Sequence, residues 1–158
     1  MAITAVHSTV ARASQALERG RGAEAAQVLA PALKAGSLTR EDELAVRIAL
    51  AEALLLQDDL TQAATTLGRP PDTVREQISD AQLSALWRLH GRITFARGEQ
   101  SRAIALHQRA LKHAELAHES RAIGLAHYEL ALAEDGLVLD FHVFVCLEVH
   151  GQVLAQPV

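Results

Sequence analysis

Two arginines four residues apart, Arg88 and Arg92, are the side chains best suited to hold a ligand. On an α-helix this spacing places both side chains on the same face. A guanidinium group on such a face can hold a carboxylate through two parallel hydrogen bonds. The alternative is that both charges are solvated while their aliphatic stems cover an apolar helix face. The pair therefore predicts either recognition of an acidic group or two solvated cations.

A second group of reactive side chains lies near the C-terminus, where His142, Cys146 and His150 follow one another at intervals of four residues. On a helix they would form one stripe, and imidazole and thiolate both bind zinc or copper. On a strand they would be about 13 Å apart at each step, too far for one ion. No fourth ligand or Cys-x-x-Cys pair accompanies them. We expect three semi-polar residues on a packed helix face and no cofactor, and keep metal binding as the alternative.

Catalytic motifs are missing from the sequence. It contains eight histidines but no His-Glu-x-x-His, and it has no nucleophile elbow, phosphate-binding glycine loop or dinucleotide fingerprint. His90 and His107 fall at expected core positions, where an imidazole is usually packed and hydrogen-bonded. The single cysteine lies in an apolar stretch, where a thiol is inert. We therefore predict a protein that is not an enzyme.

The composition indicates a folded, helix-rich chain. Among 158 residues, 49% are hydrophobic and 22% are charged, which argues against both a disordered tail and a membrane protein. Only 9 Gly and 4 Pro occur, and a formal charge of −4 argues against direct nucleic-acid binding. One Cys excludes an intrachain disulfide framework. The first residues lack the basic and apolar regions of a secretory signal, so we expect a cytoplasmic location.

Seven runs with an apolar period close to 3.6 residues are expected to form helices. Short polar or glycine-containing turns separate several of these runs, as at residues 20–22 and 97–99, which is typical of helix hairpins. Thr39 and Asp42 are expected to form a cap pair, and the proline-containing segment 68–72 is the clearest break. The expected helices span residues 5–19, 22–35, 41–57, 59–67, 81–97, 100–117 and 120–135.

Small residues recur at an interval of about 40 residues. Ala51 and Ala63 precede Gly91 and Ala103 by 40 positions, and Ala131 follows Gly91 by the same distance. A small residue at the crossing of two helices lets their backbones approach closely. The interval therefore predicts a series of helix pairs, each with a close crossing.

The third pair carries a resemblance to a known family. Trp87, Gly91, Gly98, Ala103 and Ala110 are similar to the helix-turn-helix pattern of tetratricopeptide repeats. The resemblance implies an all-α fold of stacked antiparallel helix hairpins, an α-solenoid of about three to four repeats.

The similarity varies along the chain. It is clearest over residues 81–117, lower over 41–68 and 120–134, and lowest over 5–35. Three side chains depart from the family pattern, namely His90, Thr94 and His107, and the period near 40 exceeds the usual 34 residues.

The resemblance also implies a place for the arginines. In the family, the first helix of each pair lines a concave groove, so Arg88, Arg92 and, one repeat earlier, Arg47 would face a ligand there. We expect a protein or peptide partner with an acidic segment, its apolar side chains lying beside Phe95. The chain would then be a non-enzymatic protein–protein interaction module.

Two other functions remain open. Degenerate repeats of this kind resemble the ligand-sensing arms of some bacterial transcriptional regulators, so the chain could be the sensory or dimerisation part of one. That function requires a DNA-binding helix-turn-helix, and no basic recognition helix is visible here. A small metal-binding protein is the third hypothesis, and it depends on the three C-terminal residues described above.

The two parts of the chain differ in composition. Residues 1–134 are expected to form the repeat array, whereas residues 135–158 contain no Lys or Arg and include Phe141 and Phe144. This segment is expected to be a closing helix over the last repeat, or else a strand or swapped segment that pairs between chains. A stripe formed with Leu137 and Leu147 predicts a homodimer.

Overall fold

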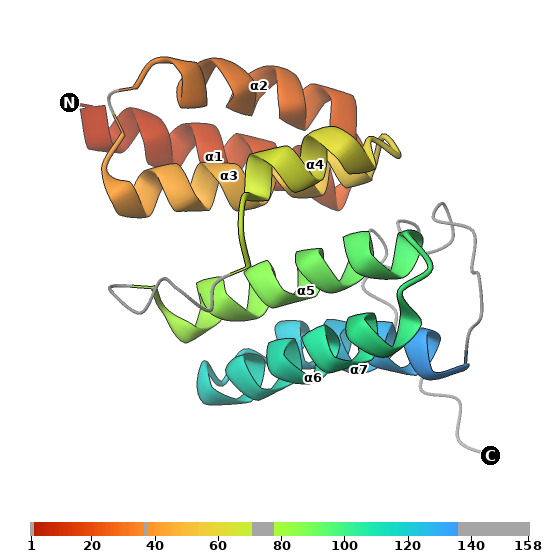
Figure 1. The fold of residues 1–158 in the computed structure, drawn as a ribbon. Helices are drawn as coiled ribbons and strands as arrows, with labels where there is room; N and C mark the ends of the chain where they lie inside the picture. The colour runs from red at the N-terminus through yellow and green to blue at the C-terminus, as the bar shows by residue number, and fades with distance from the viewer. Residues whose placement is uncertain (1, 37, 71–77, 136–158) are drawn as a thin grey trace.

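The described part of the chain folds into helices, most of which are joined to the next by a short turn (Figure 1). The structure, a computed structural model, describes residues 2–36, 38–70 and 78–135, with only the backbone described for residues 2–7 and 135. These ranges contain no strand, so the chain is all-α over the part described. The helices are α1 (Ala2–Glu18), α2 (Gly22–Lys34), α3 (Arg40–Leu55), α4 (Leu60–Leu67), α5 (Asp80–Ala96), α6 (Gln100–Leu116) and α7 (Ser120–Asp135).

All seven expected helices are confirmed, and the largest shift is the start of α1, which lies three residues before the expected residue 5. The cap pair is also confirmed, since the Thr39 side chain accepts a hydrogen bond from the backbone N–H of Asp42. Ser79 and Gln82 form a capping box at the start of α5. These side chains satisfy backbone donors that the first helical turn leaves without a partner.

Four turns between consecutive helices close with the same geometry. In each, one residue has a positive φ and the next residue donates its backbone N–H to a carbonyl five positions earlier, as in a Schellman motif. The residues with positive φ are Gly20, Asp58, Gly98 and His118. The donor–acceptor pairs are Arg21–Ala16, Asp59–Leu54, Glu99–Thr94 and Glu119–Ala114, at 2.8, 3.0, 3.1 and 3.3 Å. The chain therefore reverses its direction repeatedly by one kind of turn.

The helices pack in the order of the sequence. Every helix contacts the next one, and the odd-numbered helices also contact one another in succession: α1 with α3, α3 with α5, and α5 with α7. The even-numbered helices make no contacts with one another among the described residues. Figure 1 shows α1 to α4 on one side of the molecule and α5 to α7 on the other. The odd-numbered helices thus form a continuous series, with the even-numbered helices packed onto it.

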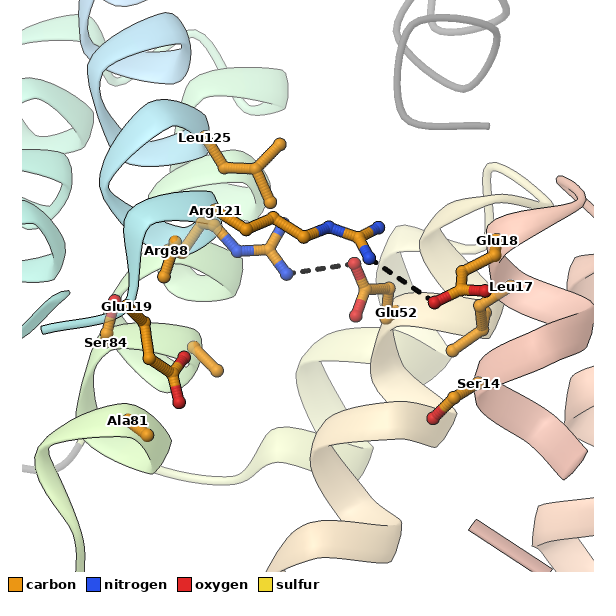
Figure 2. A pocket seen from close by; sticks show the side chains of 12 residues that line it. Ser14, Leu17, Glu18, Glu52, Ala81, Ser84, Arg88, Glu119, Arg121 and Leu125 are labelled. Carbon is orange, nitrogen blue, oxygen red and sulfur yellow. Dashed lines mark hydrogen bonds and ion pairs between the residues drawn. The ribbon is translucent and has the colours of Figure 1, made fainter. Parts of the chain in front are cut away.

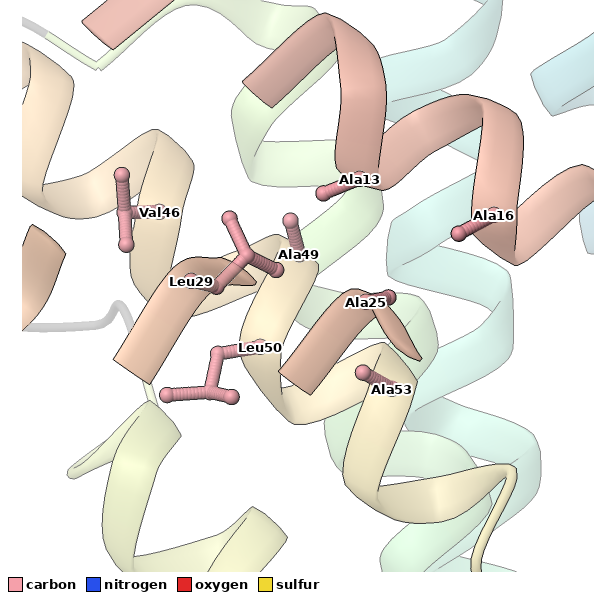
Figure 3. Close-up of a cluster of buried hydrophobic side chains, with 8 residues drawn as sticks. All are labelled: Ala13, Ala16, Ala25, Leu29, Val46, Ala49, Leu50 and Ala53. Atoms are coloured by element: carbon pink, nitrogen blue, oxygen red, sulfur yellow. The ribbon is translucent and has the colours of Figure 1, made fainter. Parts of the chain in front are cut away.

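The hydrophobic core follows the same order, because each of three clusters comes from three consecutive helices. The first cluster joins α1, α2 and α3, and five of its eight buried residues are alanines (Figure 3). The second cluster joins α3, α4 and α5, and includes Leu67 and Leu89. The third joins α5, α6 and α7 around Trp87. Since α3 and α5 each contribute to two clusters, they connect the core along the molecule.

Small residues are expected at the crossings of three helix pairs, and they are buried in two of these pairs, α3 with α4 and α5 with α6. Ala51, Ala63 and Ala103 are fully buried, and Gly91 is buried as well. The expectation for Ala131 is wrong, because this residue is exposed. In α7 the inward-facing small residues are instead Ala126 and Ala133, which are two helical turns apart. The expected closing or dimerising segment, including Leu137, Phe141, Phe144 and Leu147, lies outside the described residues.

Candidate functional site

A pocket of about 280 Å³ lies along the odd-numbered helices (Figure 2). Residues of α1, α3, α5 and α7 line it, together with one residue of the turn before α7. The lining combines apolar side chains, two hydroxyl groups, three carboxylates and two guanidinium groups. Its members are Ser14, Leu17, Glu18, Glu52, Ala81, Ser84, Ala85, Arg88, Glu119, Arg121, Ala122 and Leu125. The even-numbered helices contribute none of them.

Arg88 lies in the wall of this pocket and joins three helices through ion pairs. Its Nη2 atom is 2.9 Å from Oε1 of Glu52 on α3, and its Nη1 atom is 3.4 Å from Oε1 of Glu129 on α7. The side chains of Arg88 and Glu129 are only 9% and 4% exposed. Because buried charges are costly unless they are paired, these contacts make the relative placement of α3, α5 and α7 depend on one guanidinium group.

Glu129 also meets two other side chains. Arg92 Nε lies 3.8 Å from its Oε1 atom, and His107 Nδ1 of α6 lies 3.3 Å from its Oε2 atom. The His107 ring in turn covers Gly91, where an added Cβ atom would lie 2.5 Å from Cε1 of the imidazole. A glycine on α5 therefore creates the space that lets an imidazole on α6 reach a carboxylate on α7.

The charge state of Glu52 follows from its surroundings. Burial raises the pKa of this carboxyl group, but Arg88 and Arg92 nearby, together with the hydrogen bond from Arg88, outweigh the effect of burial. The net result is a pKa below the ordinary value of 4.5. Glu52 is therefore ionised at neutral pH, and it neutralises the guanidinium group that faces the pocket.

The structure brings Arg88 and Arg92 together at Glu129, as expected for side chains on one helix face. The alternative of two solvated arginines is wrong, because their side chains are only 9% and 10% exposed. Only Arg88 lines the pocket. Both cations already contact carboxylates of this chain, so neither offers an unmatched positive charge to an acidic ligand.

The other two expected groove residues lie outside the pocket lining. Arg47 Nε donates a hydrogen bond of 3.0 Å to the backbone carbonyl of Thr66, so this side chain joins α3 to α4. Its Nη1 atom also lies 3.6 Å from Oε1 of Glu43 on the same helix. Phe95 is half-buried near the end of α5.

Sequence reasoning missed four charged residues of the pocket: Glu18, Glu52, Glu119 and Arg121. Arg121 Nη1 lies 3.3 Å from Oε1 of Glu18, so an exposed ion pair connects the last described helix to the first (Figure 2). The two residues are 103 positions apart, and no local pattern in the sequence signals their contact. Only the shape of the folded chain brings them together.

Comparison with protein-family models, with curated proteins and with solved structures finds no significant match to this chain. None of the helices in residues 2–36, 38–70 and 78–135 is long and apolar enough to cross a membrane. The same residues contain no group of three or more His, Cys, Asp and Glu side chains placed to hold a metal ion. The metal candidates His142, Cys146 and His150 lie outside the described residues.

Proposed function

We propose that this chain is a non-enzymatic interaction module that holds a peptide or protein segment in a concave groove along its odd-numbered helices. The observation that carries the proposal is the pocket. Residues of all four odd-numbered helices line it, together with Glu119 of the turn before α7. A ligand there contacts parts of the chain that are more than 100 residues apart in sequence, from Ser14 to Leu125.

We propose further that the helices form a tetratricopeptide-like solenoid of three to four hairpins. Three features support this architecture: the packing of each helix on its sequence neighbours, the recurrence of one turn geometry and the division of the core among consecutive helices. In such an array each unit buries its apolar face only against its neighbours, and the series of first helices forms an extended binding surface.

The size of the pocket limits what enters it. Sites for drug-sized molecules usually enclose about 300–1,000 Å³, and this pocket is slightly smaller at about 280 Å³. Its volume therefore suits one or two side chains of a longer segment whose backbone runs along the surface. A peptide or an exposed protein segment fits this description better than a large cofactor does.

Selection of peptides by the purified full-length chain tests the proposal. Random twelve-residue peptides displayed on phage are panned against the chain, and enriched sequences are resynthesised for fluorescence anisotropy. We expect enriched peptides to bind the chain and to lose affinity when Ala85→Trp fills the pocket. The matched control Ala105→Trp, at an exposed position of α6, should retain binding.

Two results would count against the function. Absence of any enriched sequence would remove the groove as a peptide site. Binding that Ala85→Trp leaves unchanged would place the ligand elsewhere, provided that circular dichroism shows both variants to be folded.

A further inference from the structure

The charges that line the pocket do not balance. Three carboxylates, those of Glu18, Glu52 and Glu119, face two guanidinium groups, those of Arg88 and Arg121. Both guanidinium groups are already paired, because Arg121 contacts Glu18 at 3.3 Å and Arg88 contacts Glu52 at 2.9 Å. Among the lining residues, one carboxylate therefore remains without a cation.

That carboxylate belongs to Glu119, in the turn between α6 and α7. Its backbone is fixed, since the N–H group donates to the carbonyl of Ala114 at 3.3 Å and the carbonyl accepts from Ile123 at 3.0 Å. Its side chain is exposed and projects into the pocket (Figure 2). No cation of the described residues pairs with it, so a carboxylate on a fixed backbone faces an open space.

A second polar group lies in the same lining. Ser84 of α5 is only 2% exposed as a residue, and it belongs to the pocket lining. A hydroxyl oxygen and a carboxylate both accept hydrogen bonds, so together they suit a ligand that donates them.

The apolar part of the lining suits the rest of such a ligand. Leu17 of α1 and Leu125 of α7 are both half-buried members of the lining, and three alanines complete the apolar surface. Lys and Arg side chains combine an aliphatic stem with a charged end, and the stem packs well on apolar surface.

We propose that the pocket takes a cationic side chain, a lysine or arginine of the bound segment, whose charge meets Glu119 and Ser84. Its aliphatic stem lies against Leu17 and Leu125. This inference rests on the function proposed above and gives its ligand a chemical class. It also replaces the acidic partner expected from Arg88 and Arg92, because both of those cations contact carboxylates within the chain.

Three pools of labelled peptides test the proposal on the full-length chain. All pools have eight residues, with Leu, Val, Ala and Ser randomised at every position except one central position, which is Lys, Gln or Glu. We expect the Lys pool to bind about two- to fivefold more tightly than the Gln pool, as for one partly exposed ion pair, and the Glu pool to bind least tightly. Fluorescence anisotropy at physiological ionic strength gives the three affinities.

Variants of the chain assign the preference to the two named residues. Glu119→Gln should remove the advantage of the Lys pool over the Gln pool, and Glu119→Lys should make the Glu pool the tightest binder. Ser84→Ala should reduce the advantage of the Lys pool and leave binding of the Gln pool unchanged. The control Glu134→Lys changes net charge equally, at an exposed position near the other end of α7, and should preserve the order of the pools.

The possible results separate the two proposals. If the Lys and Gln pools bind equally, or if the Glu pool binds most tightly to the unaltered chain, the cationic ligand is wrong and the peptide groove remains. If Glu134→Lys changes the order as much as Glu119→Lys does, the preference reflects net charge and the assignment to Glu119 is wrong. If no pool binds and phage selection also finds no peptide, both the ligand and the function fail.

Discussion

Gly91 of α5 and His107 of α6 are in such close contact that an added Cβ atom on the glycine would lie 2.5 Å from Cε1 of the imidazole. His107 is 2% exposed, and its Nδ1 atom lies 3.3 Å from Oε2 of Glu129. The glycine therefore has a steric role in the middle of a helix, where glycine is otherwise unfavourable. It allows three helices to meet around one imidazole ring.

We expect Gly91→Ala to destabilise the fold by about 1–3 kcal/mol, because the new methyl group forces the buried ring to move. The loss should appear although alanine favours helices more than glycine does. Gly124→Ala in α7 is the matched control, since nothing lies within 4 Å of an added Cβ atom there. That variant should be more stable by about 0.5–1 kcal/mol. Urea unfolding measures both changes, and equal effects of the same sign would contradict the steric role.

The repeated turn gives a second expectation, at Gly98. Its φ is +80° and nothing lies within 4 Å of an added Cβ atom, so a substitution meets conformational strain and no clash. Gly98→Ala should cost about 1–2 kcal/mol, the penalty of a left-handed conformation for an L-residue. Gly98→Asn should cost less, because Asn adopts positive φ more readily. If thermal unfolding shows Asn to be as damaging as Ala, strain is not the cause.

The positions of the helices could be predicted because their signals are local. A period of 3.6 residues, cap residues such as Thr39 and short turns all act within a few positions of one another. The sequence also predicts the two turns that have no glycine at the positive-φ position, because clear apolar runs end just before Asp58 and His118 and new ones begin just after them. Ala131 was misplaced because a fixed interval of 40 residues does not hold in α7, where Ala126 and Ala133 face the core.

The candidate site was less predictable, because its contacts are long-range. The spacing of Arg88 and Arg92 indicates that they share a helix face. It does not show that two carboxylates, 36 and 41 positions away in the sequence, contact the guanidinium group of Arg88. Glu52 and Glu129 carry no local mark that distinguishes them from solvated glutamates. The departure of His90 and His107 from the family pattern was visible in the sequence, and both are buried as expected.

The buried and exposed ion pairs should differ strongly in their effect on stability. Glu129→Ala leaves Arg88 and Arg92 buried beside fewer carboxylates, so we expect a loss of about 3–5 kcal/mol. Glu18→Ala breaks an ion pair whose two side chains are 54% and 62% exposed, and should cost less than about 1 kcal/mol. Chemical denaturation of both variants measures the difference. A small loss for Glu129→Ala would show that the network does not hold α3, α5 and α7 together.

Stability should fall as the solution is acidified, for two reasons of the same sign. Burial, with Arg102 nearby, lowers the pKa of His90 below its ordinary value of 6.5, and the arginines lower that of Glu52 below 4.5 despite its burial. In both cases the unfolded chain binds protons at a pH where the folded chain does not. The contribution of His90 is lost as the pH falls from 6.5 toward its lowered pKa, and that of Glu52 is lost below 4.5.

Replacing His90 separates the two contributions. His90→Leu removes the titrating group and its buried Nε2 atom, which lacks a hydrogen-bond partner among the described residues. We expect this variant to lose the decline that begins near pH 6.5 and to keep the decline in stronger acid. The control His127→Leu, at an exposed position, should retain both. Urea unfolding between about pH 8 and pH 2.5 makes the comparison, and an unchanged upper decline in His90→Leu would assign that decline to another group.

The central claim is that the pocket along the odd-numbered helices is where a peptide segment binds. Nuclear magnetic resonance of the ¹⁵N-labelled chain tests it most directly, during titration with the tightest peptide from phage selection. We expect the amide shifts to concentrate at the lining residues of α1, α5 and α7, around Leu17, Ala85 and Leu125, and to spare α2 and α4. Shifts concentrated on the even-numbered helices, with none at these three residues, would contradict the account.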